Sequence, residues 1–487
     1  MTQHKNDYVI QLEDLYKKQF HTEATHVATI APSGSERMYI RLSDGARSAI
    51  GAYSKNVKEN NTYFYFTRIF QKSGLRVPEI YQQSNKNMCY LMEDIGEECL
   101  LDVLLREGKT EQVKAYYEQA VEDLVRFQWI GGRDIDYSMC FATQYFDQKA
   151  ILTDFNYFKY YFADILKIEY NKSLLQEELE EWAKNLDGER VKTFMYRDFQ
   201  SRNIMIKDGK LGYIDFQGGM RGLPHYDLVS LLWQAKAQLP KEWKQHLEKH
   251  YLRAIKNSKE IPDIDEPHFM KVYLECVLLR ILQTLGAYGL RGLIERKQHF
   301  ISSIYPALVQ LKEYLNDYAY IIKYPELLGI LEELVKPELM QRFYIPSQSQ
   351  EHPLKVKIYS FSYKKGLPAD TTGHGGGFVF DCRGILNPGR FEPYKDLTGR
   401  DFPVQEFLQT KTHMPAFLDN VFATIDISII DYLNRGFDCL SISFGCTGGQ
   451  HRSVYAAEQT RKHLKQVFNI EAELLHLEQD ENSHSRR

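Results

Sequence analysis

Residues 193–219 read TFMYRDFQSRNIMIKDGKLGYIDFQGG, and they are the most informative segment of the sequence. Asp198 follows Tyr-Arg, Asn203 comes five residues later, and an apolar run leads to Asp215. Two short apolar stretches flank the Asp-Gly pair at 208–209, a pattern that predicts a β-hairpin with a tight turn. Such a hairpin would bring Asn203 and Asp215 to the mouth of one cleft.

These three side chains suit the transfer of a phosphoryl group. That reaction needs one carboxylate to orient and deprotonate the attacking hydroxyl, and two oxygen ligands to hold Mg²⁺ on the phosphates of ATP. We assign the catalytic role to Asp198 and the metal-binding role to Asn203 and Asp215. The alternative is an ordinary hairpin with surface carboxylates, but the complete array is far rarer than a single Asp–Asn spacing and favours a kinase.

The sequence on either side of this segment alternates between strand-like and helical patterns. Residues 1–22 have the pattern of a polar helix, and short alternating runs between 24 and 93 surround a helix predicted at 57–73. Over 99–182, and again over 226–340, the apolar spacing is mostly helical.

On these motifs the chain resembles the aminoglycoside phosphotransferase and choline kinase superfamily over residues 10–340. It is most similar to the anomeric sugar kinases of cell-wall recycling, the N-acetylmuramate/N-acetylglucosamine kinases. The resemblance implies an α+β, protein-kinase-like bilobal fold, with an amino-terminal lobe and hinge over 1–95 and a catalytic, substrate-binding lobe over 96–340. The stretches that carry it are GSERMYIRL (34–42), LRVPEIY (75–81), LMEDIG (91–96), YRDFQSRNIM (196–205), IDFQ (214–217), YDLVSLL (226–232) and LQTLGAY (282–288).

The resemblance also implies where the nucleotide binds. The backbone from Glu93 to Ile95 would offer hydrogen-bonding groups to adenine. Gly34 and Ser35 would lie over the phosphates, where small residues allow close approach. Asp227 would brace the catalytic loop rather than contact the substrate.

Two positions depart from the family pattern. Tyr196 stands where the catalytic triplet usually has a histidine, a position that acts mainly as a scaffold. The ATP-binding lysine of many kinases has no clear equivalent, because Lys55 is shifted along the sequence. Arg37 or Arg41 could supply the missing positive charge, and we include Arg37 among the expected nucleotide-binding residues.

The acceptor is expected near LTDFNYFKYYF (152–162), where related sugar kinases have a substrate-facing helix. Asp154 and Tyr157 are the candidate contacts to sugar hydroxyls. The alternative for each aromatic residue of this segment is a place in the packed core.

A second domain follows a change of composition. Prolines and small polar residues at 341–353 predict a linker, and strands then alternate with helices over 354–487, which predicts a separate α/β domain. Its key stretch is SISFGCTGGQHRSVYAAE (441–458), a strand that turns into a helix through small residues. Backbone N–H groups, the helix amino terminus and Arg452 would converge there on a phosphate or sulfate.

The alternatives for this stretch are a plain tight turn and a cysteine-dependent phosphatase. The spacing C-x-x-x-x-x-R-S fits the second, but Gly445 stands where such enzymes have a histidine and no general acid can be assigned. The residues expected to bind an anion are Arg383, Cys446, Thr447, Gly448, Gly449, His451, Arg452 and Ser453.

Residues 354–478 resemble the carboxyl-terminal domain of the RNase adapter protein RapZ. The resemblance implies a sensor of the amino-sugar phosphate glucosamine-6-phosphate that can also contact RNA. The Walker A loop of that family's amino-terminal partner has no counterpart in this sequence. The matching stretches are SFSYKKGLP (360–368), VFDCRGILNPG (379–389), LTGRD (397–401) and GCTGGQHRSV (445–454).

The bulk composition is that of an ordinary soluble protein. The 487 residues allow two to four domains, and a net charge of −4 gives no bulk attraction to nucleic acid or to anionic membranes. No uncharged apolar run of about 18 residues predicts a membrane span, and the amino terminus lacks the apolar core of a signal peptide. The seven cysteines lack metal-type spacing, which indicates reduced thiols in the cytoplasm.

The sequence therefore predicts a cytoplasmic kinase that uses ATP and Mg²⁺. Its expected acceptor is the anomeric hydroxyl of N-acetylmuramate or N-acetylglucosamine in peptidoglycan recycling, and its second domain is expected to sense an amino-sugar phosphate. The alternative is a regulatory protein without catalysis, which binds nucleotide, sugar phosphate or RNA.

Overall fold

The computed structural model describes residues 7–30, 37–346, 353–369 and 377–479. The predicted nucleotide-binding residues Gly34 and Ser35 lie outside these ranges. The chain divides into two compact units. The first comprises Asn6–Leu290 and Pro306–Met340, and the second comprises Met1–Lys5, Arg291–Tyr305 and Gln341–Arg487.

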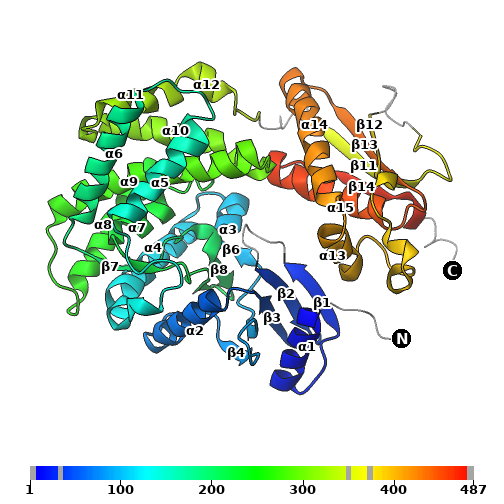
Figure 1. Cartoon of the computed structure of the whole chain (residues 1–487), viewed down its shortest axis with the longest axis horizontal. Helices are drawn as coiled ribbons and strands as arrows, with labels where there is room; N and C mark the ends of the chain where they lie inside the picture. Colours follow the sequence, from blue (N-terminus) through cyan, green and yellow to red (C-terminus); the bar gives the residue numbers. More distant parts are fainter. Residues whose placement is uncertain (1–6, 31–36, 347–352, 370–376, 480–487) are drawn as a thin grey trace. The chain divides into compact units, whose positions relative to one another are not determined.

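The amino-terminal lobe of the first unit contains a five-stranded antiparallel sheet (Figure 1). Ile40 and Leu42 alternate with half-buried residues along the second strand and are fully buried, so one face of the sheet lies against a core. In spatial order the strands are β1 (His26–Ile30), β2 (Met38–Ser43), β3 (Ser48–Tyr53), β5 (Cys89–Glu93) and β4 (Ile80–Gln83).

Two helices complete this lobe. Helix α1 (Asp7–Phe20) packs against β3, β4 and β5. Helix α2 (Val57–Lys72) begins where the side chain of Asn56 accepts the N–H of Glu59, and it ends before Gly74, which has a φ of 71°. The helix predicted at 57–73 is therefore confirmed.

The second lobe is mostly helical, as predicted for 99–182 and 226–340. Short strands lie between its helices: β6 (Glu98–Cys99), β7 (Thr193–Met195), β8 (Ile204–Lys207), β9 (Lys210–Tyr213) and β10 (Met220–Gly222). The helices are α3 (Leu100–Glu107), α4 (Glu111–Val125), α5 (Gln148–Phe158), α6 (Lys172–Asp187), α7 (Pro224–Leu232), α8 (Lys241–Asn257), α9 (Glu266–Tyr288), α10 (Gln298–Tyr318), α11 (Pro325–Leu334) and α12 (Pro337–Gln341).

Strands β8 and β9 form the hairpin that the sequence predicts. Their antiparallel register closes on Lys207 and Lys210, and the two turn residues, Asp208 and Gly209, have φ values of 53° and 69°. Two left-handed residues in a two-residue loop define the turn type for which Asp-Gly is favoured. The hairpin lies between the catalytic loop and Asp215.

The long helix α9 is a core element of this lobe. With the turn that follows it, the stretch Glu266–Ile294 is long and apolar enough to cross a membrane by length and composition, and 56% of its most apolar window is buried within the fold. A single helix of this kind is weak evidence for a membrane span, because the core helix of a globular protein passes the same test.

The second unit contains a four-stranded sheet in the order β12-β13-β11-β14 (Figure 1). All its strand pairs are parallel, so the carboxyl ends of the four strands meet at one edge. The strands are β11 (Lys355–Ser362), β12 (Phe378–Asp381), β13 (Cys439–Cys446) and β14 (Glu473–His476), and the helices are α13 (Phe402–Thr410), α14 (Met414–Arg435) and α15 (Arg452–Phe468).

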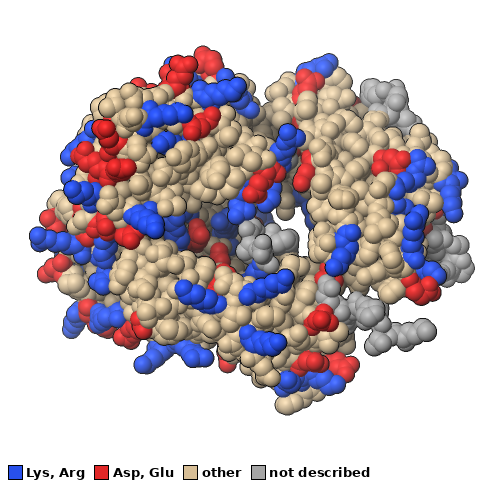
Figure 2. Space-filling view, in the orientation of Figure 1, with Lys and Arg blue, Asp and Glu red and all other residues tan. Residues whose placement is uncertain are grey.

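Basic and acidic side chains are interspersed over the face shown in Figure 2. This distribution agrees with the small net charge of −4.

Candidate active site

A buried carboxylate accepts hydrogen bonds from the backbone of the catalytic loop, the segment that carries Asp198. Asp227, on α7, accepts the N–H groups of Tyr196 (2.7 Å) and Arg197 (2.9 Å), and Gln128 donates to it at 3.1 Å. Burial raises the pKa of Asp227 to about 7, and the three hydrogen bonds act against this rise. The predicted bracing role of Asp227 is thus confirmed.

The loop itself has an unusual backbone. Arg197 and Asp215 adopt φ values of 79° and 70°, a region that residues other than glycine rarely occupy. Such conformations persist where the surrounding structure over-determines them. Here the hydroxyl of Tyr196 donates to the carbonyl of Ile214 (2.6 Å), which joins the two loops that carry Asp198 and Asp215. Tyr196 is a scaffold residue, as its position predicts.

Asn203, Asp198 and Asp215 lie together. The amide Nδ2 of Asn203 donates to the carbonyl oxygen of Asp198 (2.9 Å) and to Oδ2 of Asp215 (3.3 Å). Burial raises the pKa of Asp215 to about 6, and the charge of Asp198 adds to the rise. Asp215 is exposed and the side chain of Asp198 is 41% exposed, so a cation could reach these two carboxylates and offset their mutual repulsion.

This donor set fits Mg²⁺. An amide oxygen and a carboxylate are the hard ligands that this ion takes from proteins, and the remaining positions belong to water and phosphates. The described residues contain no group of three or more His, Cys, Asp or Glu side chains that would make a complete protein cage. Asn203 and Asp215 would hold the ion only together with the nucleotide.

Asp198 has an arginine partner that the sequence did not reveal. Nη2 of Arg280, on α9, donates to Oδ1 of Asp198 at 3.0 Å, and its Nη1 contacts the hydroxyl of Tyr226 (3.1 Å) and Oε1 of Gln283 (2.7 Å). Burial raises the pKa of Asp198, but the charges of Arg280, Arg202 and Arg197 bring it below the ordinary value. No described residue donates a hydrogen bond to Oδ2 of Asp198, which leaves that oxygen for an acceptor.

The two residues predicted to contact the acceptor, Asp154 and Tyr157, already interact with other side chains. Asp154 is buried on α5 and forms a two-pronged ion pair with Arg197 of the catalytic loop, with distances of 2.6 and 2.8 Å. Its carboxylate orients that loop, so a sugar hydroxyl would have to compete with Arg197 for it. Tyr157 is half-buried on the same helix, with its ring against Tyr161 (4.8 Å between ring centroids).

On the nucleotide side, the two candidate arginines have different positions. Arg37 is 3% exposed and forms an ion pair with Glu59 of α2 at 2.9 Å. Nε2 of Gln217 donates to Glu59 (3.5 Å) and to Asp215 (2.9 Å), which connects this pair to the carboxylate predicted to bind the metal. Arg41 instead pairs with Asp94 in the hinge, at 2.7 Å. Of the two arginines, Arg37 is therefore the one linked to Asp215.

Some of the backbone groups of the hinge already form hydrogen bonds within the protein. The N–H of Glu93 donates to the carbonyl of Glu79 (2.8 Å), and Lys207 donates to the carbonyl of Asp94 (2.6 Å). The N–H and C=O groups of Ile95 make no hydrogen bond to the described residues, so they are the groups available to a base. Of the residues predicted to contact adenine, Ile95 therefore has backbone groups available for it, whereas the N–H of Glu93 is already bonded to Glu79.

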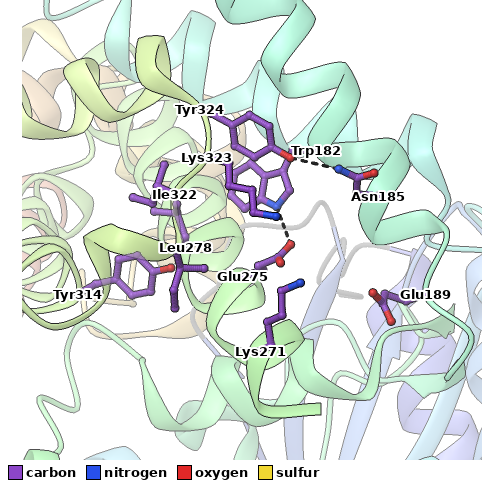
Figure 3. Close-up of a pocket in the computed structure, with 11 residues that line it drawn as sticks. Trp182, Asn185, Glu189, Lys271, Glu275, Leu278, Tyr314, Ile322, Lys323 and Tyr324 are labelled. Atoms are coloured by element: carbon purple, nitrogen blue, oxygen red, sulfur yellow. Dashed lines mark hydrogen bonds between the residues drawn. The ribbon is translucent and has the colours of Figure 1, made fainter. Parts of the chain in front are cut away.

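The helical lobe also has a cavity away from this centre. A pocket of about 260 Å³ is lined by α6, α9 and residues 314–324, and none of its lining residues belongs to the catalytic loop. Figure 3 shows the edge of Trp182 turned toward Glu275, and Nε1 donates to that carboxylate at 3.2 Å. Burial raises the pKa of Glu275.

In the second unit, Cys446 lies at the carboxyl edge of the sheet. Its Sγ accepts the N–H of Gly449 at 3.2 Å and lies 3.2 Å from the hydroxyl of Ser453. Burial raises the pKa of Cys446, but these contacts and the charge of Arg452 leave it below the ordinary value. The N–H groups of Thr447 and Gly448 donate to no described residue, and nothing lies within 4 Å of a Cβ placed on Gly448. This part of the turn is open to an anion.

Two of the predicted anion contacts, Arg452 and His451, have partners within the domain, and Nη2 of Arg452 also donates to Oγ1 of Thr447 in the turn at 3.4 Å. Arg452 is buried, and its Nη1 donates to the carbonyls of Ile385 (2.7 Å) and Arg383 (3.1 Å), because the segment after β12 would otherwise have unsatisfied carbonyl groups. His451 is buried and directs Nε2 to the carbonyl of Tyr394 (2.8 Å). Arg383 is the outward arginine, stacked over Tyr363 at 3.9 Å and paired with Asp381.

Comparisons with known families agree with this division. Residues 49–264 match the model of the phosphotransferase enzyme family, and residues 354–480 match the RapZ C-terminal domain. Two separate segments of the chain are thus similar to two different families. The predicted kinase-like bilobal fold and the predicted separate α/β domain are confirmed, and the structure adds that the sheet of the second is parallel.

Individual relatives cover parts of the chain. A nucleotide-binding protein of Herminiimonas arsenicoxydans is 38% identical over 123 residues, which are 25% of this chain and 41% of that protein. A nucleotide-binding protein of Dinoroseobacter shibae is 40% identical over 106 residues, which are 22% of this chain and 34% of that protein. The chain thus spans about two-fifths of the length of the curated relatives it matches.

Among solved structures, the choline kinase LicA from Streptococcus pneumoniae has a TM-score of 0.41 and 15% identity, over 63% of this chain and 100% of that chain. An ethanolamine kinase of Plasmodium vivax has a TM-score of 0.42 and 13% identity, over 61% of this chain and 84% of that chain.

Proposed function

We propose that this protein is a small-molecule kinase that transfers a phosphoryl group from ATP to an alcohol, with Mg²⁺ as the metal. The observation that carries the proposal is the meeting of Asp198, Asn203 and Asp215 at one point, next to the Arg37–Glu59 ion pair. The match of 49–264 to the phosphotransferase family supports it.

The acceptor we propose is the anomeric hydroxyl of N-acetylmuramate or N-acetylglucosamine, in cytoplasmic recycling of peptidoglycan. The sequence resemblance to the anomeric sugar kinases supports this choice. The chemistry of Asp198 supports it as well, because a carboxylate with a lowered pKa is a weak base and a hemiacetal hydroxyl is more acidic than an ordinary alcohol.

Each residue has a defined role in this mechanism. Asp198 accepts the proton of the acceptor hydroxyl on Oδ2, while Arg280 fixes the opposite oxygen, Oδ1. Arg37 neutralises charge on the nucleotide phosphates and is itself oriented by Glu59. Asn203 and Asp215 would hold Mg²⁺, which supplies charge neutralisation on the transferred phosphoryl group.

Acceptor-dependent ADP release from the full chain, with ATP, Mg²⁺ and a panel of sugars, tests the proposal. The Asp198→Asn variant should lose at least about 10²-fold in rate, the usual contribution of a positioned base, with little change in nucleotide affinity. Full activity in this variant would contradict the assignment of Asp198. Nucleotide binding without ADP release on any acceptor would favour the alternative, a nucleotide-sensing regulatory protein.

For the second unit we propose an amino-sugar phosphate, such as glucosamine-6-phosphate, at the carboxyl edge of the sheet. The open N–H groups of Thr447 and Gly448, and Arg383 nearby, support an anion there. Calorimetry of the full chain with glucosamine-6-phosphate tests it, with glucosamine as the control that lacks the phosphate. Equal heats from the two ligands would contradict the proposal, and binding of RNA alone would favour the RNA-contacting alternative.

A further inference from the structure

Two cysteines lie at the ends of neighbouring strands in the second unit. Strands β12 and β13 pair in parallel, and the last pair in their register is Asp381 with Gly445. Cys382 and Cys446 are the next residues along the chain. Asp381 has an extended backbone, with a φ of −93° and a ψ of 107°, so the strand direction continues as far as Cys382. The two cysteines therefore occupy opposite positions at the carboxyl edge of the sheet.

Both side chains lie on the same face of the sheet. Two residues earlier on each strand, Phe380 and Phe444 are paired, and their rings stack at 5.5 Å between centroids. Side chains two residues apart on a strand share a face, so each cysteine follows its phenylalanine. Cys382 and Cys446 are 0% and 2% exposed and belong to one hydrophobic cluster, together with Phe444.

This placement suits a disulfide. Neighbouring strands lie about 4.8 Å apart, and a disulfide joins Cα atoms that are about 4.4–6.8 Å apart. The turn that begins at Cys382 contacts β13, which keeps the two segments together beyond the last pair of the register. Both thiols are free in this structure.

The two thiols differ in their surroundings. Burial raises the pKa of Cys446, but the contacts of its Sγ with Ser453 and the N–H of Gly449, and the charge of Arg452, outweigh burial. Burial also raises the pKa of Cys382, and the charge of Cys446 adds to that rise. Cys446 is thus the thiol that ionises more easily, and the ionised thiol is the form that an oxidant attacks.

Access to the pair is narrow. The slight exposure of Cys446 excludes a bulky disulfide reagent. The next residues, Thr447 and Gly448, are exposed, and no described residue lies within 4 Å of a Cβ placed on Gly448. Hydrogen peroxide is small enough to enter there, so it is the oxidant that we name.

We propose that Cys382 and Cys446 form a reversible disulfide, which peroxide makes and small thiols break. The thiolate of Cys446 attacks one oxygen of the peroxide, and the O–O bond breaks. Hydroxide leaves and takes up the proton that the Cys446 thiol released, which gives water and a sulfenic acid. Cys382 then attacks Sγ of Cys446, the S–O bond breaks, and the proton of Cys382 leaves with the hydroxide as a second water. The two sulfurs lose two electrons, and the peroxide gains them.

The disulfide would change the turn that is proposed to bind the phosphate. A thiolate that enters a disulfide loses its charge, so the N–H of Gly449 and the hydroxyl of Ser453 lose a strong acceptor. Thr447 and Gly448 lie between Cys446 and Gly449, so their backbone should move. The Kd for glucosamine-6-phosphate should rise roughly tenfold, as for the loss of one hydrogen bond. This consequence rests on the proposed function of the second unit, whereas the disulfide does not.

Peptide mapping of the full chain tests the disulfide. The reduced protein is treated with hydrogen peroxide, its remaining thiols are blocked in denaturant, and its tryptic peptides are weighed without reduction. We expect peptide 366–383, with Cys382, to be joined to peptide 436–452, with Cys446, and dithiothreitol to separate them. Peptide 436–452 also contains Cys439, so Cys439→Ser is the matched control and should give the same cross-link as the parent.

Three results would overturn the disulfide. The first is a Cys446 that is oxidised to its sulfenic or sulfinic acid without a cross-link, and the second is a cross-link that is lost in Cys439→Ser. The third is a pair that stays reduced in the folded protein under peroxide that oxidises both cysteines in denaturant. All three are read without any sugar phosphate.

Calorimetry with glucosamine-6-phosphate tests the consequence for the turn. Oxidised parent protein should bind more weakly than reduced protein, and dithiothreitol should restore the affinity. Cys382→Ala should bind like the reduced parent before and after peroxide, and an unfolding temperature within about 2 °C of the parent shows that it is folded. Equal affinity of the reduced and the cross-linked parent would overturn the coupling. If neither form binds, the proposed ligand fails, and peptide mapping alone decides the disulfide.

Discussion

Replacing Arg280 with methionine removes the charge beside the catalytic carboxylate while it keeps an unbranched side chain in the core. Arg280 is 4% exposed, and Asp198 is its only acidic partner among the described ion pairs. The variant would leave Oδ1 of Asp198 without its donor at 3.0 Å. Asp198 would then be free to rotate away from the acceptor hydroxyl.

The size of the effect follows from the geometry. A charge-assisted hydrogen bond contributes about 1.5–3 kcal/mol when both partners are buried. The side chain of Asp198 is 41% exposed, so water screens part of this interaction and about 1–2 kcal/mol remains. At about 1.4 kcal/mol for each factor of ten, kcat should fall roughly 5- to 30-fold.

The pH profile gives a second, independent readout. Arg280 is the largest of the charges that lower the pKa of Asp198, so its removal raises that pKa. Because the ionised form is the one that accepts the proton, the acid limb of kcat/KM should move to higher pH. Arg280→Lys, which keeps a charge, should shift this limb less.

Initial rates of ADP release at several pH values measure both effects, and thermal unfolding at neutral pH controls for stability. The reasoning would be refuted by an Arg280→Met protein that folds and has the parent kcat and the parent acid limb. A loss of rate without a shift of the limb would show that Arg280 acts on packing and not through the charge of Asp198.

Three further predictions follow from other contacts of the two sites. Asp215→Ala should remove the thermal stabilisation by Mg·ATP. In the parent protein, the affinity for Mg·ATP should weaken as the pH falls through about 6, where Asp215 gains a proton. An affinity that does not depend on pH would count against Asp215 as a metal ligand. Arg37→Met should raise the KM for ATP roughly tenfold, because it removes the cation proposed to contact the phosphates. Arg41→Met should leave those contacts intact and chiefly loosen the hinge. Equal changes in the KM for ATP in the two variants would contradict the assignment of Arg37. Cys446→Ser should keep most of the affinity for glucosamine-6-phosphate in calorimetry, because the turn after Cys446 is proposed to bind the phosphate through backbone N–H groups. Thiol-dependent release of phosphate from an ester would instead establish the phosphatase alternative.

Local sequence signals predicted the parts of the site that depend on local structure. The Asp-Gly turn at 208–209 fixed the hairpin, and the hairpin brought Asn203 and Asp215 together. Arg280 could not be found in this way, because it lies 82 residues from Asp198 and its neighbours on α9 read as an ordinary apolar helix. The signal available in the sequence was an arginine within an otherwise apolar stretch of this helix.

The direction of a long side chain was also beyond the sequence. Arg37 and Arg41 lie in one strand-like run, and only the position of Glu59 and Asp94 shows which one is linked to Asp215. Arg452 lies at the predicted place before a helix, but it binds two carbonyl groups within the domain. Spacing locates a residue on its element, whereas its partners come from distant segments.

The position of Arg280 has a consequence for dividing the protein into parts. The family match ends at residue 264, and every residue of the catalytic motif lies before that point. The partner of Asp198 lies after it, on α9. A chain truncated at 264 would keep the whole signature and lose the helix that carries the arginine partner of Asp198, so the unit that we propose to be a kinase is longer than the segment that matches the family model.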